Sequence, residues 1–552
     1  MTSEDMDCHA TLAMTVLFHD SGSLSGFMQV GHRSPALFAN FKCTMTYILA
    51  LDQGTSSSRS ILFDARGQIV AMAQQEFAQI YPQPGWVEHD PMVIWQTQLD
   101  TARQVLAKVG IDAKAVRALG ITNQRETTVV WNRVSGRPIY NAIVWQDRRA
   151  EPACAALRAQ GKTEQIQAKT GLRVDAYFSG TKLQWILDNV PGARQQAAQG
   201  DLLFGTVDSW LVWQLTGGCE ANTRAQAVHT TDVSNAARTM LLNVRSNQWD
   251  PDLLHAMDIP ANLLPEVKPS SALFGQVQPA LLGSAIPIGG IAGDQQSALF
   301  GQACFQPGMM KNTYGTGCFM LMHTGANFQT SANGLITTSA AQVTTQPQFA
   351  IEGSVFVGGA VVQWLRDGLR AFPSSADVQA LAESVPDSGG VMVVPAFTGL
   401  GAPYWKPDAR GTITGLTRGS TMAHIARAAL ESIAFQSAAL LQAMQRDAAQ
   451  TGSVAVTELR VDGGACVNNL LMQFQADLLG IPVIRPAVTE TTALGAAYLA
   501  GLSTGVFAGL DELSAQWRTE RRFEPQQSPV WAAEQMARWA RAVEQTVADK
   551  AI

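Results

Sequence analysis

Residues 47–64, YILALDQGTSSSRSILFD, are expected to decide the fold, because two apolar runs flank a short turn that is rich in hydroxyl groups. Residues 47–51 and 60–63 are predicted to form the two arms of a β-hairpin. The turn offers Gly54 for a positive-φ conformation, consecutive backbone N–H groups, four hydroxyls and then Arg59, which together can cradle an anion. A serine-rich surface hairpin has the same composition, so both interpretations stay open for the motif alone.

Asp52 ends the first arm of this hairpin, beside the anion cradle. A carboxylate that faces a phosphate is repelled unless a cation such as Mg²⁺, or water bound to that cation, lies between them. The hairpin therefore predicts a phosphate and a metal ion together, with Asp52 as the candidate metal ligand.

Size and charge limit the class of protein. The chain has 552 residues, 46% of them hydrophobic, and two or more domains are expected because single cores stop growing at about 250–300 residues. The 39 Lys and Arg residues against 45 Asp and Glu residues give a net charge of −6 without a basic block. This argues against nucleic acid as a partner and favours a small ligand. No apolar run reaches the roughly 18–20 residues of a membrane span, so no membrane insertion is expected.

The cysteine content argues against two kinds of site. The 7 cysteines are scattered, odd in number and never in CxxC spacing, which argues against a zinc site and a disulfide framework. A reducing compartment, and hence a cytoplasmic location, is expected.

Residues 1–44 do not resemble the rest of the chain. Their acidic start and short apolar run do not match a signal peptide, and Met45 stands just before the hairpin. We expect an extension from a mispredicted upstream start, or a disordered arm. An intact mass that includes Met1 would exclude the first of these.

Polar groups also follow two later strands. Strands are predicted at 118–122 and 127–131, with Asn123, Gln124, Arg125 and Glu126 between them, and ligands of open α/β sheets sit at such strand ends. A solvated turn with a surface ion pair is the alternative. A glycine-rich strand over 285–294 ends in Asp294, ahead of a helix predicted over 295–305, where a plain N-cap is the alternative role for Asp294.

The second half repeats the plan of the first. KNTYGTGCFMLMHT, which begins at Lys311, is a second strand–turn–strand about 260 residues after the first. Gly463 and Gly464 separate a later strand from the helix that Asn468 starts, which would let a ring or a phosphate approach the backbone, or would serve packing alone. The last segment, 528–549, is predicted to be an amphipathic helix docked on the C-terminal half.

The chain contains, in order, LDQGTSSSR, GITNQRETT, YFSGTK, IAGDQQSALFGQ, KNTYGTGCFMLM and VDGGA. This order resembles the FGGY family of sugar kinases, and the wording resembles the members that phosphorylate glycerol, from residue 47 to about 523. The resemblance implies an α/β fold of the actin-like ATPase (ribonuclease-H-like) type, with two duplicated domains around a central cleft. The implied domains are 45–300, for glycerol and phosphate, and 301–525, for the adenine nucleotide, followed by a C-terminal helix over 526–552.

The resemblance also implies a reaction and its residues. ATP and glycerol would give ADP and sn-glycerol 3-phosphate, the entry step of glycerol catabolism, with Mg²⁺ held by Asp52 and Asp294, partly through water, in a homodimer or homotetramer. Asp294 would be the general base. Glycerol would be bound by Arg125, Glu126, Tyr177, Asp294 and Gln295, with Trp145 and Phe319 against its carbons. ATP would be bound by Thr55, Ser56, Ser57, Arg59, Thr316, Gly359, Gln363, Gly464 and Asn468.

Two rival functions remain open at this point. The first is a kinase of the same family for another polyol or a ketose, because the ATP half would be shared. The second is a non-catalytic actin-like or chaperone-like ATPase module, which would have no reason to keep Arg125, Glu126, Tyr177 and Asp294 together. Regulation transfers least: the stretch QVQPALLGSAI, where some relatives bind fructose 1,6-bisphosphate, has no cation to hold a phosphate.

Overall fold

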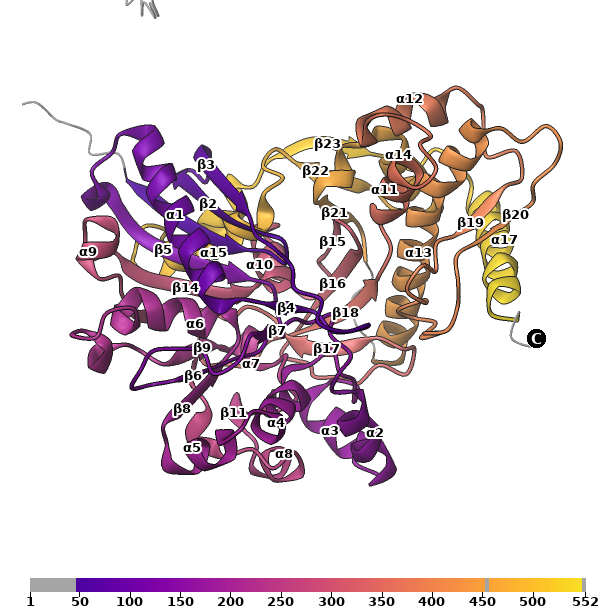
Figure 1. Cartoon of the computed structure of the whole chain (residues 1–552). Coiled ribbons are helices and arrows are strands. Elements are labelled where there is room, and N and C mark those ends of the chain that lie inside the picture. Colours follow the sequence, from indigo (N-terminus) through magenta and orange to yellow (C-terminus); the bar gives the residue numbers. More distant parts are fainter. Residues whose placement is uncertain (1–45, 452–455, 549–552) are drawn as a thin grey trace, which may run out of the picture. The chain divides into compact units, whose positions relative to one another are not determined.

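The computed structural model describes residues 46–451 and 456–548 (Figure 1). The predictions for residues 1–44 therefore lie outside the described residues. Two mixed β-sheets, of six and seven strands, form the centre of the described part. No helix of the described residues is long and apolar enough to cross a membrane.

The first sheet is built around the predicted hairpin and has the strand order β13-β14-β5-β1-β2-β3. Its strands are β1 (Tyr47–Gln53), β2 (Ser57–Asp64), β3 (Ile69–Glu76), β5 (Val116–Asn123), β13 (Ser271–Gln276) and β14 (Pro287–Gly293). β1 and β2 are antiparallel, with Asp52 opposite Arg59, whereas β5 and β14 run parallel to β1. The hairpin is confirmed, but the prediction of a positive φ at Gly54 is wrong. The Gly54 N–H donates to Ser57 O at 2.9 Å, so this turn closes without a left-handed residue.

The two faces of the first sheet are covered by different helices, because successive side chains of a strand point to opposite faces. Leu49 and Leu51 face α1 (Pro91–Val109) and α6 (Val207–Trp213), whereas Ile48 and Ala50 face α15 (Thr491–Ser503). Helix α1 begins as predicted: the Asp90 side chain accepts a hydrogen bond from the Met92 N–H, ahead of a proline at the first turn.

The second sheet repeats the strand plan of the first, with the order β17-β18-β16-β15-β21-β22-β23. Its strands are β15 (Met310–Tyr314), β16 (Cys318–Gly325), β17 (Ile336–Ser339), β18 (Phe349–Val355), β21 (Leu459–Asp462), β22 (Val483–Pro486) and β23 (Thr519–Phe523). β15 and β16 form the second hairpin, β18 adds an antiparallel strand, and β21 and β22 lie parallel on the other side of β15. This is the plan of β1, β2, β3, β5 and β14, so the predicted repeat is confirmed.

One helix, α10 (Asp294–Gly301), contacts both sheets and also packs along α15. On the second sheet Leu321 faces α10, whereas Met320 and Met322 face the opposite side, where α13 (Met422–Thr451), α14 (Asn469–Leu479) and α17 (Pro529–Ala548) lie. α10 is shorter than the predicted 295–305 and ends at Gly301, and Ala303 has a positive φ.

Helices from the C-terminal part of the chain pack on both halves of the structure. Trp539 of α17 stacks on Phe435 of α13 with ring centroids 5.4 Å apart, which confirms the docked C-terminal helix. Helix α15 instead packs on the first sheet, so closely that a Cβ at Gly120 would lie 2.2 Å from Ala496 O. The domain boundaries predicted at 45–300 and 301–525 remain predictions, since α15 follows the second sheet in sequence but covers the first.

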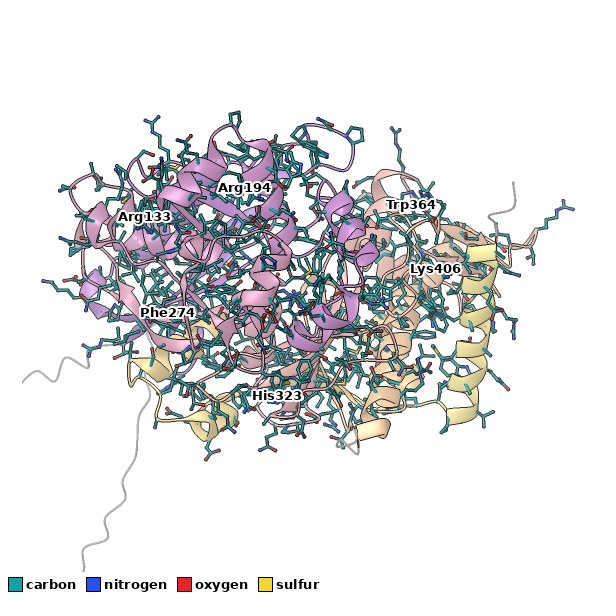
Figure 2. The ribbon with its side chains drawn as sticks, turned by 90° about the horizontal axis from the view of Figure 1, so that it is seen from below. Arg133, Arg194, Phe274, His323, Trp364 and Lys406 are labelled. Atoms are coloured by element: carbon teal, nitrogen blue, oxygen red, sulfur yellow. The ribbon has the colours of Figure 1, made fainter. Side chains whose placement is uncertain are left out.

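The remaining elements surround these layers. In the first half they are β4 (Glu88–His89), β6 (Val129–Asn132), β7 (Ala142–Ile143), α2 (Glu151–Ala159), α3 (Thr163–Thr170), α4 (Ser179–Asn189), α5 (Ala193–Gln199), β8 (Leu202–Gly205), β9 (Thr230–Asp232), α7 (Val233–Ala236), β10 (Leu242–Asn243), β11 (Gln248–Trp249), α8 (Pro251–Ala256), β12 (Glu266–Lys268) and α9 (Pro279–Leu282). In the second half they are α11 (Ala360–Asp367), α12 (Val378–Glu383), β19 (Met392–Val394), β20 (Thr412–Thr414) and α16 (Leu510–Gln516). Side chains fill the spaces between layers, as at Phe274 of β13, which is 1% exposed (Figure 2).

Candidate active site

The β1–β2 turn presents part of its hydroxyl set outward. Ser56 is exposed and Thr55 and Ser57 are half-buried, whereas Ser58 points into the core and hydrogen-bonds to Thr97 at 2.8 Å. Thr55 Oγ1 accepts a hydrogen bond of 2.9 Å from the indole N–H of Trp145. The turn is therefore tied to one of the residues predicted to pack on glycerol.

Arg59 lies between two carboxylates. Its guanidinium is 2.8 Å from Asp52 Oδ2 and 2.8 Å from Glu490 Oε2, and Asp52 raises the pKa of Arg59. Burial raises the pKa of Asp52 above its usual range, although Arg59 opposes this shift. The motifs did not point to Glu490, which lies just before α15 and reaches the turn only through the tertiary fold.

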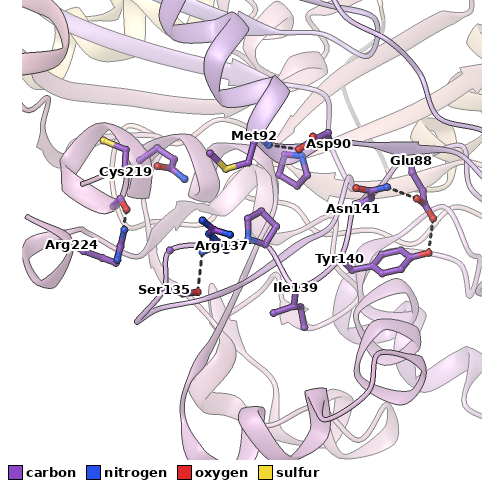
Figure 3. A pocket seen from close by; sticks show the side chains of 15 residues that line it. Glu88, Asp90, Met92, Ser135, Arg137, Ile139, Tyr140, Asn141, Cys219 and Arg224 are labelled. Atoms are coloured by element: carbon purple, nitrogen blue, oxygen red, sulfur yellow. Dashed lines mark hydrogen bonds between the residues drawn. The ribbon is translucent and has the colours of Figure 1, made fainter. Parts of the chain in front are cut away.

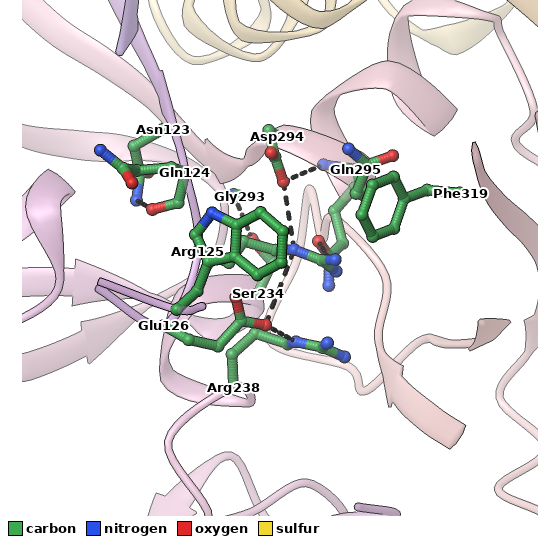
Figure 4. Close-up of polar contacts among 12 residues, drawn as sticks. Asn123, Gln124, Arg125, Glu126, Ser234, Arg238, Gly293, Asp294, Gln295 and Phe319 are labelled. Carbon is green, nitrogen blue, oxygen red and sulfur yellow. Dashed lines mark hydrogen bonds and ion pairs between the residues drawn. The ribbon is translucent and has the colours of Figure 1, made fainter. Parts of the chain in front are cut away.

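The turn between β5 and β6 is buried, so its ion pair is not a surface ion pair on a solvated turn. Arg125 is 3% and Glu126 1% exposed, and Glu126 has a positive φ of 62°. Arg125 Nε lies 3.1 Å from Asp294 Oδ1 and 3.8 Å from Glu126 Oε1, so the guanidinium stands between the two carboxylates (Figure 4). Two residues predicted to bind glycerol therefore meet Asp294 at the end of the first sheet.

Two residues that the sequence analysis missed complete this charge cluster. Glu352 of β18 accepts two hydrogen bonds from Arg125, of 2.5 and 3.1 Å, and lies 3.0 Å from Arg238 NH2. Arg238 Nε in turn lies 2.5 Å from Glu126 Oε1. Burial would raise the pKa of Glu352, but Arg125 and Arg238 outweigh it and lower that pKa to about 2. A single carboxylate in the apolar strand FAIEGSV was the only clue to Glu352 in the sequence.

Asp294 begins α10 directly after β14. Gly293 is the N-cap of this helix, so Asp294 does not have the plain N-cap role. Its Oδ1 accepts a hydrogen bond of 2.7 Å from the Gln295 N–H and pairs with Arg125. Although 32% of the side chain is accessible, surrounding protein atoms desolvate the carboxylate and raise the pKa of Asp294, against the pull of Arg125 and Lys311. Asp294 is thus an accessible carboxylate within a charged cluster.

Gln295 is held by a buried lysine. Lys311 Nζ of β15 lies 2.6 Å from Gln295 Oε1, 2.6 Å from Thr313 Oγ1 and 3.2 Å from Phe319 O, and burial lowers the pKa of Lys311 to about 8. Lys311 thus connects Gln295 with Phe319, and Figure 4 shows Phe319 beside Gln295. Lys311 was not among the predicted site residues.

Two aromatic rings border the cluster. Trp145 and Tyr177 meet edge to face with centroids 5.7 Å apart, and the Arg238 guanidinium lies 5.5 Å from the Tyr177 ring. Lys182 of α4 donates to Tyr177 O at 2.5 Å, which fixes the backbone at that position. Trp145 and Tyr177 are thus in direct contact, and Arg238 connects Tyr177 with Glu126.

Three loops at the second sheet contain the remaining residues that are predicted to bind the nucleotide. The Gly358 N–H donates to Thr316 O and the Gly359 N–H to Gly315 O, both at 2.8 Å, which joins the β15–β16 turn to the start of α11, where Gln363 lies exposed. Gly464 is exposed, with open space where a Cβ would stand, and Asn468 caps α14 through its side chain. These loops follow strands that correspond to those of the first sheet.

Asp52 fits the metal role that the sequence suggests. Among the described residues no group of three or more His, Cys, Asp and Glu side chains could hold a metal ion. Asp52 Oδ2 is buried and accepts no hydrogen bond of ordinary geometry, although Arg59 lies beside it. Mg²⁺ is usually bound by one or two carboxylates together with substrate phosphates, so the buried Asp52 carboxylate beside the turn suits it, although Asp52 is paired with Arg59 in this structure.

A cavity of about 810 Å³ lies away from these residues (Figure 3). Its lining includes Glu88, Arg137, Tyr140, Cys219 and Arg224, and none of the predicted site residues. Glu88 there accepts hydrogen bonds from Tyr140 and Asn141, both of 2.8 Å.

Comparison with known proteins identifies the family of this chain. Models for the N-terminal and C-terminal domains of the FGGY family of carbohydrate kinases match residues 47–301 and 310–504. The chain belongs to the FGGY family of carbohydrate kinases. This FGGY chain is 78% identical over 503 residues to a glycerol kinase of Albidiferax ferrireducens. The matched residues cover 91% of this chain and 100% of that protein. It is 73% identical over the same length to a glycerol kinase of a Polaromonas species, again over 91% of this chain and 100% of that protein.

Solved structures of the family share the fold. The crystal structure of Plasmodium falciparum glycerol kinase with ADP has a TM-score of 0.83 and 35% identity, and covers 91% of this FGGY chain and 98% of its own. A xylulose kinase from Lactobacillus acidophilus has a TM-score of 0.80 at 22% identity, over 92% of this chain and 99% of its own. The predicted fold class is confirmed.

Proposed function

We propose that this FGGY kinase transfers the γ-phosphoryl group of ATP to glycerol and releases ADP and sn-glycerol 3-phosphate. The observation that carries the proposal is the convergence of Arg125, Glu126, Asp294 and Gln295 at the end of the first sheet. Identity of 78% to a glycerol kinase along nearly the whole described chain supports it. A kinase for a ketose is disfavoured, because relatives that are 69% to 78% identical to this chain are glycerol kinases.

An uncharged triol needs both donors and acceptors for its three hydroxyls. Arg125 supplies donors, Glu126 and Asp294 supply acceptors, and the Gln295 amide and the Tyr177 phenol supply both kinds. Trp145 and Phe319 would give the carbon chain an apolar wall, as small-ligand sites require. The exposure of Asp294, 32% in a cluster that is otherwise buried, leaves one carboxylate open to a ligand.

Asp294 would act as the general base on the hydroxyl that attacks the phosphate. It stands at the end of β14 with one oxygen held by the Gln295 N–H and by Arg125, which fixes the carboxylate in place. Phosphoryl transfer asks mainly for positioning and charge neutralisation, so an aspartate of modest basicity suffices.

Thr55, Ser56, Ser57 and Arg59 would hold phosphate oxygens, while Thr316, Gly359, Gln363, Gly464 and Asn468 would hold the rest of ATP. Asp52 and Asp294 would hold Mg²⁺, partly through water. When bound, this ion neutralises charge that develops on the phosphate oxygens. A cytoplasmic location and assembly as a homodimer or homotetramer remain predictions. Light scattering after size exclusion would measure the mass of the assembly.

The first test is ADP release by purified protein with Mg-ATP, without an acceptor and then with glycerol, dihydroxyacetone, erythritol and xylulose in turn. Strong stimulation by glycerol above the others supports the proposal. Stimulation by xylulose or dihydroxyacetone instead keeps the fold and changes the substrate. ADP release that is indifferent to every acceptor supports the nucleotide-switch alternative and contradicts the kinase.

A further inference from the structure

The second sheet contains a row of residues that reaches the predicted glycerol site. Lys311 of β15 is paired with Leu321 of β16, and Leu321 is paired with Glu352 of β18. Residues directly opposite each other on paired strands point to the same face of a sheet. Leu321 packs on the side of α10, so Lys311 and Glu352 flank it on the face that meets the start of that helix.

Lys311 and Glu352 of this row are fully buried, and each one contacts a residue of the predicted glycerol site. Glu352 accepts two hydrogen bonds from the Arg125 guanidinium, which also donates to Gln296 Oε1. The two bonds to Glu352 fix the plane of the guanidinium and leave Nε directed at Asp294. Lys311 donates to Gln295 Oε1, so the Gln295 amide NH₂ is left for another acceptor. Neither Lys311 nor Glu352 is placed against the expected glycerol itself.

We propose that Lys311 and Glu352 are positioning residues for the polyol: Glu352 orients Arg125, Lys311 orients Gln295, and the glycerol site is incomplete without the second sheet. The inference rests on the proposed function, because it concerns how the same site is held. It adds two buried charged residues of the second sheet to the apolar contact that is already predicted for Phe319 of β16.

The competing explanation is that Lys311 and Glu352 only stabilise the fold, since buried charges must be paired whatever the protein does. The two explanations differ in the kinetic parameter that changes. Loss of pairing alone lowers thermal stability and the amount of active protein, but leaves KM for glycerol unchanged in the molecules that fold. Loss of orientation raises KM for glycerol and leaves KM for ATP nearly unchanged, since neither residue contacts the predicted nucleotide residues.

The test compares Glu352→Gln and Lys311→Met with the parent protein in glycerol-dependent ADP release and in thermal unfolding. Each variant is expected to raise KM for glycerol by about tenfold to a hundredfold, the scale of a lost hydrogen bond to a charged group, with KM for ATP little changed. Glu352→Asp keeps the charge but withdraws the carboxylate, and it is expected to raise KM for glycerol by less than Glu352→Gln.

Arg460→Met is the matched control. Arg460 lies in the same row, paired with Lys311 from the neighbouring strand β21, but it donates to Gln302 O and contacts none of the predicted glycerol residues. This variant should lose stability and keep the parent KM for glycerol.

An unchanged KM for glycerol in both Lys311→Met and Glu352→Gln overturns the inference, and so does an equal rise in the KM values of glycerol and ATP. Should Glu352→Gln fail to fold, Lys311→Met and Glu352→Asp decide the matter by the same criterion. A parent protein that shows no polyol-dependent ADP release contradicts the proposed function itself, which is a different result from normal turnover by the variants.

Discussion

The two repeated hairpins of this kinase end in turns of different chemistry. The β1–β2 turn is followed by Arg59, which lies 2.8 Å from both Asp52 and Glu490. The β15–β16 turn contains two glycines around Thr316 and no charged side chain, and it is joined to the next loop through the N–H groups of Gly358 and Gly359. The β1–β2 turn therefore presents charged and hydroxyl side chains, whereas the β15–β16 turn presents mainly backbone groups.

The same division extends to the loops that follow the parallel strands. β5 and β14 of the first sheet lead into Arg125 and Asp294, whereas β21 of the second leads into Gly463 and Gly464. The two sheets therefore share a strand plan, but the edges formed by the ends of their parallel strands carry different side chains. We expect changes to the first edge to alter the chemical step, and changes to the second edge to alter nucleotide binding through shape.

Asp294→Asn should give the largest effect. We expect kcat to fall by roughly 10²–10⁴ or more, the scale of a positioned general base, with little change in KM for ATP. Steady-state ADP release at saturating glycerol measures this. Near-normal turnover by a folded Asp294→Asn protein would remove Asp294 from the role of base.

Arg59→Met should give the next largest effect, because it removes the cation of the first turn. We expect kcat/KM for ATP to fall by about tenfold to a hundredfold, as for the loss of a charged hydrogen bond, with KM for glycerol little changed. Glu490→Gln is the matched control: it leaves Arg59 and Asp52 paired, so kcat/KM for ATP should be kept or improved. Equal losses in both variants would mean that the three-residue pairing, rather than the cation, matters.

Gly317→Ala should damage the second turn through its backbone. A Cβ at Gly317 would lie 2.4 Å from Val355 O, so the turn must move away from the end of β18. We expect a loss of about 1–3 kcal/mol of stability, as for overpacking, together with a raised KM for ATP. Thermal unfolding and ATP kinetics check this, and an unchanged unfolding temperature would contradict the close approach.

Gly464→Ala should give the smallest effect and separates packing from ligand approach. Nothing lies within 4 Å of a Cβ at Gly464, so the unfolding temperature should not change. If ATP approaches the backbone there, KM for ATP should rise by about threefold to tenfold, because overpacking by a methyl group costs about 1 kcal/mol or more. An unchanged KM would assign Gly464 no part in binding.

Much of the fold could be predicted from local patterns. The hairpin over 47–64, the Asp90 cap and the repeat at Lys311 follow from alternating apolar residues, capping chemistry and turn composition, which act between near neighbours. The errors were local as well: Gly54 does not have a positive φ, and α10 ends at Gly301, before the predicted end of the helix. A glycine permits a left-handed conformation but does not require one.

The sequence by itself determined the order of the motifs and hence the family, the strand ends at which Arg125 and Asp294 lie, and the two hairpins. Only the tertiary structure decided what holds them. Arg125 and Glu352 are 227 residues apart in the chain, and Arg59 and Glu490 are 431 apart. A lone charge in an apolar strand shows that a partner is needed, since an unpaired buried charge is costly. The lone charge does not show which residue is its partner, because that partner is distant in sequence and comes close only when the chain folds.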